Sequence, residues 1–278
     1  MERAVIRRKA TEHDGEARDG GVQSVDRALH IIETLAEDDE GYRLSDLAVR
    51  TGLSTSTAHR LLTTLEKRRF VQFDRTESKW HVGAKSFAVG ATFTRRRNFV
   101  AQATPYLRKL RDQTRETANL AVVDDESIIV LTRIESREIM RSLTKVGGRV
   151  AMVASGVGKA VLATYPDEDV SAIIRRHGMP RLTEKSIVRA SDLFRELAAI
   201  RRQGYAVDDE EARMGLRCVA AVVFNDCGEP LAAISVSGMT SRVTEARLPE
   251  VGKAVREVAA ELTAAIGGVM PAPTAKSA

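Results

Sequence analysis

Cysteine is scarce in this sequence of 278 residues, which contains only Cys218 and Cys227. Their spacing matches neither a zinc site nor a disulfide framework. Zinc and iron-sulfur proteins, and the small disulfide-rich proteins of the cell exterior, are therefore disfavoured. We expect reduced thiols, no metal and no other cofactor.

Long apolar runs are also missing. The richest run, residues 218–224, has the length of a strand, whereas a membrane-spanning helix needs about 18 to 20 apolar residues. Residues 1–20 mix acidic and basic side chains and lack the apolar centre of a secretory signal. No unit of about 20 to 50 residues repeats along the chain, so a solenoid or propeller is not supported. We expect a cytoplasmic protein in which residues 1–20 and 269–278 are disordered tails.

The remaining composition is that of a folded, water-soluble protein, with 43% hydrophobic and 29% charged residues. A chain of this length exceeds one average domain and suits a small domain joined to a larger one. The net charge of +5 is unevenly distributed, because residues 43–97 hold twelve Lys and Arg against four Asp and Glu. Such a basic segment is either a nucleic-acid-binding face or a solvated surface, so the local pattern must decide.

Three helices are predicted from residue 24 to residue 69. Residues 24–37 place apolar side chains on one helical face, with Ser24 as the N-cap. That face comprises Val25, Ala28, Leu29, Ile32, Leu35 and Ala36. A short second helix ends at Gly52, whose left-handed backbone lets the chain reverse, and Ser54 caps a third helix over residues 55–69. Such a helix-turn-helix occurs both in DNA-binding proteins and as plain structure.

The exposed side of the third helix favours the DNA-binding interpretation. Its first two turns carry no carboxylate, although acidic residues are favourable at that end of an ordinary helix. Short hydroxyls and free amides there can bind phosphate oxygens, while longer donors can reach base edges. The predicted contact residues are Ser54, Thr55, Ser56, Thr57, His59 and Arg60.

An alternating segment, residues 70–82, predicts a β-hairpin directly after the third helix. Phe73 and Trp80 would cover the helices. Arg75 and Lys79 would lie near the tip, where they can contact phosphate or the minor groove. The hairpin completes a winged helix-turn-helix, which we expect to span residues 21–83.

Residues 84–97 predict a linker helix, whose last three arginines either touch DNA or keep the linker soluble. Beyond it, residues 98–268 mix helical and strand patterns. Helices are expected over residues 98–117, 156–165, 170–177, 193–204 and 244–266, and strands over residues 119–123, 128–134, 219–224 and 231–237. The simplest packing is one mostly antiparallel sheet flanked by helices.

Three segments of the second domain are similar to catalytic motifs. Residues 155–160 depart from phosphate-binding and dinucleotide-binding loops, so they form either a helix start that favours a small anion or a tight turn. The carboxylates of residues 208–211 suit a solvated turn or cap better than a metal site or acid pair. Cys218 is expected to be a buried, unreactive thiol, and an enzyme built on Cys218 and His177 is the alternative.

Residues 22–268 resemble the IclR (isocitrate lyase regulator) family of bacterial transcription factors, and especially its acetate-operon, or glyoxylate bypass, repressor branch. The resemblance rests on LSDLAVRTGLSTSTAHRLLTTL (44–65), ASGVGKAVLA (154–163), GYAVDDEEARMGLRCVAA (204–221) and AAISVSG (232–238). It implies an α+β fold, with the winged helix-turn-helix followed by a GAF-like α/β effector domain. It also implies a dimer, or a homotetramer built as a dimer of dimers, on double-stranded operator DNA.

The same resemblance assigns an effector pocket to Gly156, Val157, Asp208, Leu216, Cys218, Ser235 and Ser237. Amides at the helix start and the two serine hydroxyls would hold a carboxylate, beside an apolar wall. Asp208 would face an acid, so it must carry a proton, act through water, or hold a hydroxyl or hydrated aldehyde. Ser142 lies near where relatives place an apolar pocket residue, which leaves several effectors open.

These patterns together predict a DNA-binding transcriptional repressor that responds to a small carboxylate such as glyoxylate or pyruvate. A regulator of the same family that senses an aromatic or sugar-derived acid is the first alternative. An enzyme that uses the second domain's cavity is disfavoured by the helix-turn-helix. An architectural DNA-binding protein without a ligand is disfavoured by the polar pocket residues.

Overall fold

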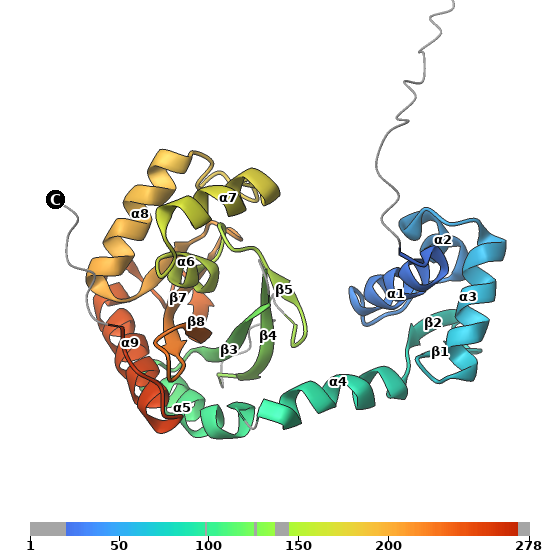
Figure 1. The fold of residues 1–278 in the computed structure, drawn as a ribbon, viewed down its shortest axis with the longest axis horizontal. Helices are drawn as coiled ribbons and strands as arrows, with labels where there is room; N and C mark the ends of the chain where they lie inside the picture. The colour runs from blue at the N-terminus through green and yellow to red at the C-terminus, as the bar shows by residue number, and fades with distance from the viewer. Residues whose placement is uncertain (1–20, 98, 125–126, 137–144, 272–278) are drawn as a thin grey trace, which may run out of the picture. The chain divides into compact units, whose positions relative to one another are not determined.

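The computed structural model describes residues 21–97, 99–124, 127–136 and 145–271, and the chain divides into two compact units after Gly90 (Figure 1). The division falls inside helix α4 (Ala84–Arg97), in the segment expected to be a linker. The predicted tail of residues 1–20, most of the second tail and Ser142 lie outside the described residues. The side chains of the three linker arginines lie outside them as well.

The first unit is a three-helix bundle with a hairpin. Its elements are α1 (Gln23–Ala36), α2 (Leu44–Thr51), α3 (Thr55–Lys67), β1 (Val71–Asp74) and β2 (Lys79–Val82). The strands pair antiparallel, with Phe73 opposite Trp80. The hydrophobic core of this unit comprises Ile31, Leu35, Tyr42, Leu47, Leu62, Val71 and Trp80. The predicted winged helix-turn-helix is confirmed.

The turn between α2 and α3 depends on two residues. Gly52 ends α2 in the left-handed region, with a φ of 65°, and its N–H donates to the carbonyls of Ala48 and Val49. Two residues later the Ser54 hydroxyl accepts the Thr57 N–H at 3.2 Å and caps α3. A glycine C-cap followed at once by a serine N-cap explains why the chain reverses within so few residues.

Helix α1 differs from its prediction in its cap and in the face that it buries. It begins at Gln23 with Val22 as the N-cap residue, so the predicted Ser24 cap is wrong. Val25 and Leu29, predicted to be buried, are 55% and 54% exposed. The buried positions of the helix are Ile31, Thr34 and Leu35, all in its last turns.

The second unit is built on one six-stranded antiparallel sheet. The strands are β3 (Thr117–Asp124), β4 (Ser127–Ile134), β5 (Arg149–Val150), β6 (Ala206–Asp209), β7 (Leu216–Phe224) and β8 (Pro230–Met239). Their order across the sheet is β5-β4-β3-β8-β7-β6. The helices are α5 (Phe99–Thr114), α6 (Gly156–Leu162), α7 (Asp167–His177), α8 (Ala190–Gln203) and α9 (Leu248–Ala265), with the 3-10 turn η1 (Glu245–Arg247) before α9.

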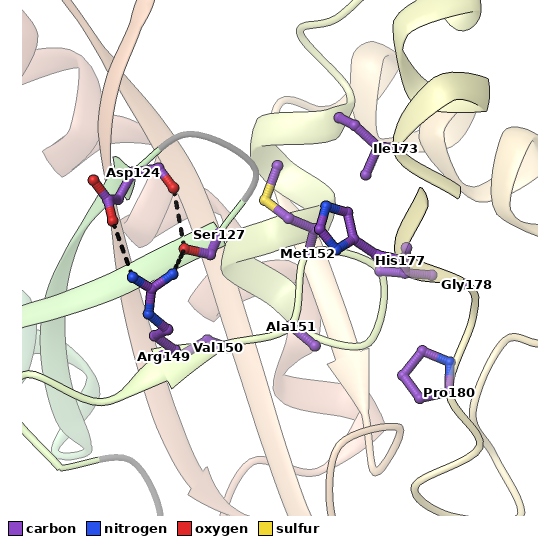
Figure 2. Close-up of a pocket in the computed structure, with 11 residues that line it drawn as sticks. Asp124, Ser127, Arg149, Val150, Ala151, Met152, Ile173, His177, Gly178 and Pro180 are labelled. Carbon is purple, nitrogen blue, oxygen red and sulfur yellow. Dashed lines mark hydrogen bonds and ion pairs between the residues drawn. The ribbon is translucent and has the colours of Figure 1, made fainter. Parts of the chain in front are cut away.

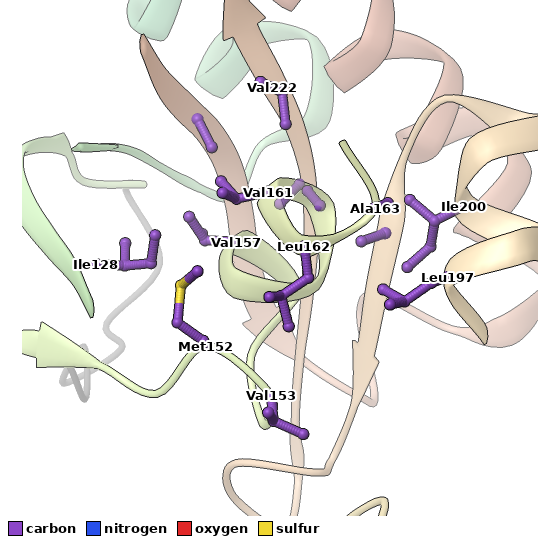
Figure 3. Packing of buried hydrophobic residues seen from close by; sticks show 14 of the residues in the cluster. Ile128, Met152, Val153, Val157, Val161, Leu162, Ala163, Leu197, Ile200 and Val222 are labelled. Atoms are coloured by element: carbon purple, nitrogen blue, oxygen red, sulfur yellow. The ribbon is translucent and has the colours of Figure 1, made fainter. Parts of the chain in front are cut away.

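Helices cover both faces of this sheet (Figure 1). Helices α5 and α9 pack on one face, and α6, α7 and α8 lie over the other, where Leu162 and Leu197 belong to the apolar cluster of Figure 3. Because side chains alternate along a strand, Cys218 faces the α6 side while its neighbour Val219 faces α9. The predicted α+β class, with a flanked antiparallel sheet in the second domain, is confirmed.

The predicted elements of the second unit differ mainly at their ends. Helix α5 ends at Thr114, because Arg115 adopts a left-handed φ of 63° and Thr117 already begins β3. The short edge strand β5 had no prediction. Val269, the first residue of the predicted second tail, is held in place because its N–H donates to the Asn225 carbonyl at 2.9 Å.

A buried ion pair joins α6 to the segment after β6. Lys159 of α6 has no exposed surface, and its Nζ contacts Glu211 and lies 3.4 Å from Glu196 Oε1. Burial raises the pKa of Glu211, and the charge of Lys159 opposes that rise. The other oxygen of Glu211, Oε2, has no hydrogen-bond partner among the described residues. The Glu211 charge therefore depends on Lys159.

Replacing Lys159 by Met should lower the free energy of unfolding by about 3 to 5 kcal/mol, because it leaves a buried carboxylate without its cation. The double variant Lys159→Met, Glu211→Leu should recover most of that loss. Lys253→Met is the matched control, since Lys253 forms an exposed pair with Glu257 at 3.8 Å and should cost less than about 1 kcal/mol. Urea denaturation measures all three, and a double variant as unstable as the single one would contradict the assignment.

Candidate functional site

The start of α3 presents a connected group of hydroxyls. The Ser54 hydroxyl lies 3.1 Å from Ser56 Oγ and 2.9 Å from Thr57 Oγ1. Thr57 is half-buried, whereas Ser54, Thr55, Ser56, His59 and Arg60 are exposed. The first turn holds no acidic residue, so the positive end of the helix and its amides can receive a phosphate. Ser54 itself is already engaged as the helix cap.

The two cations predicted for the wing have different surroundings. Arg75 is exposed in the turn of the hairpin, which Asp74 closes by accepting the Thr76 N–H at 2.7 Å. Lys79 is only 26% exposed, and its Nζ lies 3.4 Å from Glu77 and 3.9 Å from Glu40. Arg75 is therefore the more available cation for a phosphate, because Lys79 must leave acidic neighbours.

The aromatic residues of the wing also differ. Trp80 is buried in the core of the unit, as predicted, with 5% of its surface exposed. Phe73, predicted to cover the helices, is 38% exposed and lies outside the core cluster of the unit, and its ring packs against Trp80 with the centroids 4.9 Å apart.

The second unit contains a cavity of about 320 Å³ between the sheet and the start of α6. Six residues assigned to the effector pocket line it, namely Val157, Asp208, Leu216, Cys218, Ser235 and Ser237. Gly156, the seventh, lies behind this wall. A Cβ added there would lie 2.9 Å from the Cys218 carbonyl oxygen, so glycine at this position lets α6 approach β7 closely.

Strand register explains why these side chains meet. Ser237 is opposite Cys218, and Cys218 is opposite Asp208, so the three lie in one row across β8, β7 and β6. Ser235 lies two residues from Ser237 on the same face, opposite Asn119 of β3. Adjacent strands are about 4.8 Å apart, so the row extends polar groups across the floor of the cavity.

Sequence reasoning missed several residues that line the cavity. Asn119 is the main one, because its Nδ2 donates to Ser235 Oγ at 3.3 Å and to Ser237 Oγ at 3.2 Å. The others include Ser155, the apolar Leu182, and the exposed Arg149 and Arg213. The available signal for Asn119 was a lone amide in the middle of an otherwise apolar strand.

Asp208 is buried, which contradicts the solvated turn expected for residues 208–211. Its Oδ1 accepts the N–H groups of Glu211 at 2.8 Å and Ala212 at 3.3 Å, and only 3% of its surface is exposed. Burial, followed by the charge of Glu211, raises the pKa of Asp208 to about 6. The reason is the antiparallel pairing of β6 with β7, which turns Asp208 inward and its neighbour Asp209 outward. Asp208 can therefore change protonation state near neutral pH.

Cys218 and His177 do not form a catalytic pair. Cys218 lines the cavity described above, and burial raises the pKa of its thiol to about 11. His177 lines a neighbouring cavity of about 520 Å³, which shares Arg149, Val150 and Ala151 with the first one (Figure 2). In the lining of this larger cavity, Arg149 donates to Ser127 Oγ at 2.7 Å and lies 3.4 Å from Asp124 Oδ2. No histidine among the described residues lines the cavity that contains Cys218.

The described residues were also searched for a metal site and for a membrane-spanning helix. Among them, no group of three His, Cys, Asp or Glu side chains is placed to hold a metal ion. None of the described helices is long and apolar enough to cross a membrane.

A helix-turn-helix with an exposed, acid-free helix start and a separate domain with a ligand-sized cavity define a DNA-binding regulator with a sensor domain. Two family models match the chain: the IclR helix-turn-helix domain over residues 24–75 and the bacterial transcriptional regulator IclR C-terminal domain over residues 91–264. The chain belongs to the IclR family of bacterial transcriptional regulators, and it is not an enzyme.

Individual relatives agree with this assignment. The acetate operon repressor of Salmonella typhimurium is 41% identical over 251 residues, which cover 90% of this chain and 92% of that protein. The transcriptional repressor IclR of Escherichia coli is 41% identical over 252 residues, with the same two shares. A solved IclR homologue from Microbacterium hydrocarbonoxydans, complexed with 4-hydroxybenzoate, has a TM-score of 0.75 at 22% identity, covering 88% of this chain and 99% of that one. The last likeness concerns the fold alone.

Asp208→Asn should change how stability depends on pH. The folded pKa of Asp208, about 6, exceeds the ordinary value of about 3.9. Its stabilising contribution is therefore complete below the unfolded pKa and is lost as pH rises through 6. From pH 4 to pH 7 the parent should lose on the order of 2 to 3 kcal/mol relative to the variant, measured by urea denaturation.

The control for this prediction is Asp74→Asn. Hydrogen bonds from the Glu77 and Thr76 amides lower the pKa of Asp74, so its contribution is lost as pH falls and the sign of the difference should reverse. Parallel pH profiles for the parent and Asp208→Asn would show that Asp208 ionises in its usual range.

Proposed function

We propose that this protein is a cytoplasmic repressor, dimeric or a dimer of dimers, whose binding to double-stranded operator DNA is modulated by a small carboxylate in the cavity of the second unit. The observation that carries the proposal is the hydroxyl pair of Ser235 and Ser237 on the floor of that cavity, beside the Asn119 amide. Neighbouring hydroxyls that share one sheet face can bond both oxygens of one carboxylate.

A backbone amide on the opposite side of the cavity can also bind the acid. The Ser155 hydroxyl already accepts the Gly158 N–H at 3.0 Å, and the Val157 N–H at the start of α6 has no hydrogen-bond partner among the described residues. This amide can therefore bond an acid oxygen. Leu216 and Cys218 supply the apolar wall between the two ends.

Asp208 would select the end of the ligand that carries no carboxylate. Above a pH of about 6 it is mainly ionised and accepts hydrogen bonds, which suits a hydroxyl or the hydrate of an aldehyde. Glyoxylate combines a carboxylate with a readily hydrated aldehyde. The oxo group of pyruvate only accepts hydrogen bonds, so it would need a protonated Asp208 or a bridging water. A two- or three-carbon oxoacid is therefore our first candidate.

An aromatic or sugar-derived acid is the second candidate, favoured by the size of the cavity. A volume of about 320 Å³ lies at the lower end of the range for drug-sized ligands, about 300 to 1,000 Å³, and exceeds what three carbons fill. The complex of the Microbacterium homologue with 4-hydroxybenzoate shows that a protein of this fold takes an aromatic acid.

In the DNA interface we expect Arg75 to contact phosphate and Arg60 to read bases. Arg75→Ala should reduce the slope of log K against log salt by about 0.9 and leave sequence preference unchanged. Lys79→Ala is the control and should change the slope less, because Glu77 and Glu40 already face this lysine.

Arg60→Ala should cost about 1 to 3 kcal/mol of binding free energy on the operator and much less on random DNA. Equal losses on both DNAs would assign Arg60 to the backbone instead.

Thermal shift with glyoxylate, pyruvate and 4-hydroxybenzoate tests the effector proposal. At a hundred times its dissociation constant, the effector should stabilise the parent by about 2.7 kcal/mol. Ser237→Ala should abolish most of that shift. It also leaves one hydrogen of the buried Asn119 amide without its acceptor, so the ligand-free protein should lose about 1 to 3 kcal/mol of stability. Ser171→Ala should respond like the parent, because Ser171 is a half-buried residue of α7 that does not line the cavity. No shift with any of the three acids would refute the proposed ligand class.

A further inference from the structure

Asn119 occupies the centre of the donor cluster on the cavity floor. It lies on β3 directly opposite Ser235 of β8, and 9% of its surface is exposed. Its Nδ2 is within hydrogen-bonding distance of both serine oxygens, at 3.3 and 3.2 Å. The cavity thus contains three polar side chains whose hydrogen bonds are linked.

The chemistry of the amide decides which way the hydroxyls point. An amide nitrogen carries two hydrogens and accepts nothing, so it fills one lone pair on each serine oxygen. Each hydroxyl hydrogen must then point away from Asn119, toward the cavity or the neighbouring sulfur of Cys218. A neutral thiol is a weak acceptor, and the raised pKa of Cys218 keeps it neutral. The hydroxyl hydrogens therefore stay available to a stronger acceptor.

We propose that Asn119 is a specificity-determining positioning residue, which holds Ser235 and Ser237 as hydrogen-bond donors and so makes the cavity select a carboxylate over a neutral group of the same shape. The selection of a ligand rests on the proposed function, whereas the orientation of the hydroxyls does not. An aspartate at this position would reverse the arrangement. Its oxygens would accept both hydroxyl hydrogens and add a charge that repels an acid.

The orientation can be tested without any ligand. In the free protein, NMR of the Asn119 side-chain amide should show two hydrogen-bonded protons that exchange slowly with water. Ser235→Ala should shift one of them and Ser237→Ala the other, because each variant removes one acceptor. Amide signals that respond to neither variant would overturn the inference. Asn119 itself is not substituted in this experiment, so the result does not depend on whether Asn119 variants fold.

Selection is tested by the ratio of the dissociation constants for pyruvamide and pyruvate, which have nearly the same shape but differ in charge. Hydrogen bonds to charged groups contribute about 1.5 to 3 kcal/mol, or roughly 10-fold to 100-fold. Asn119→Asp should shift the ratio toward pyruvamide by at least about 100-fold, and Asn119→Ala by about 10-fold. The matched control, Asn225→Asp in the turn between β7 and β8, should leave the ratio unchanged, since Asn225 does not line the cavity.

The outcomes separate the two proposals. A merely structural role for Asn119 would weaken both ligands equally and keep the ratio constant, which would overturn the inference. If the parent bound neither glyoxylate, pyruvate nor pyruvamide, the proposed oxoacid effector would be wrong. The NMR result would then decide the hydroxyl orientation by itself.

Discussion

The contact between Lys159 and Glu211 is the interaction on which the sensor domain depends. Lys159 lies one turn after the start of α6, and the Glu211 N–H is bonded to Asp208. The pair therefore connects the wall of the cavity to its floor. Both charges are buried, and a buried charge without its partner is strongly unfavourable. The ion pair therefore fixes the position of helix α6 relative to the segment after β6. These two segments form the cavity, so its shape does not depend on a ligand.

Most of the fold could be predicted from local patterns. Gly52 and Ser54 define the helix-turn-helix, because a C-cap and an N-cap act within a few residues of the chain. The alternation along β7 and β8 was also readable, and it placed Ser235 and Ser237 on one face. Helix α1 shows the limit of this reasoning. Its periodicity indicates a face, but only the tertiary packing decides which part of that face is covered.

The polar residues of the cavity were harder to predict, because their environment is created by distant segments. Asn119 lies 116 residues from Ser235, with which it bonds, and no local pattern states that β3 and β8 are neighbours. The carboxylates of residues 208–211 look like a solvated turn in the sequence. Asp208 and Glu211 are buried only because Lys159, 52 residues from Glu211, and the turn amides satisfy them. The family resemblance identified Asp208 where physical reasoning on the sequence had not.

The burial of Cys218 lowers the reactivity of its thiol toward oxidants and electrophiles. Only a thiolate attacks such reagents, and a thiol whose pKa is about 11 is almost entirely protonated at neutral pH. The charge of Asp226 also raises the pKa of the Cys227 thiol, but Cys227 is exposed in the turn between β7 and β8, so it is the thiol that reagents in solution can reach. A dye or spin label added to the native chain would therefore attach at that turn and leave the wall of the sensing cavity chemically intact.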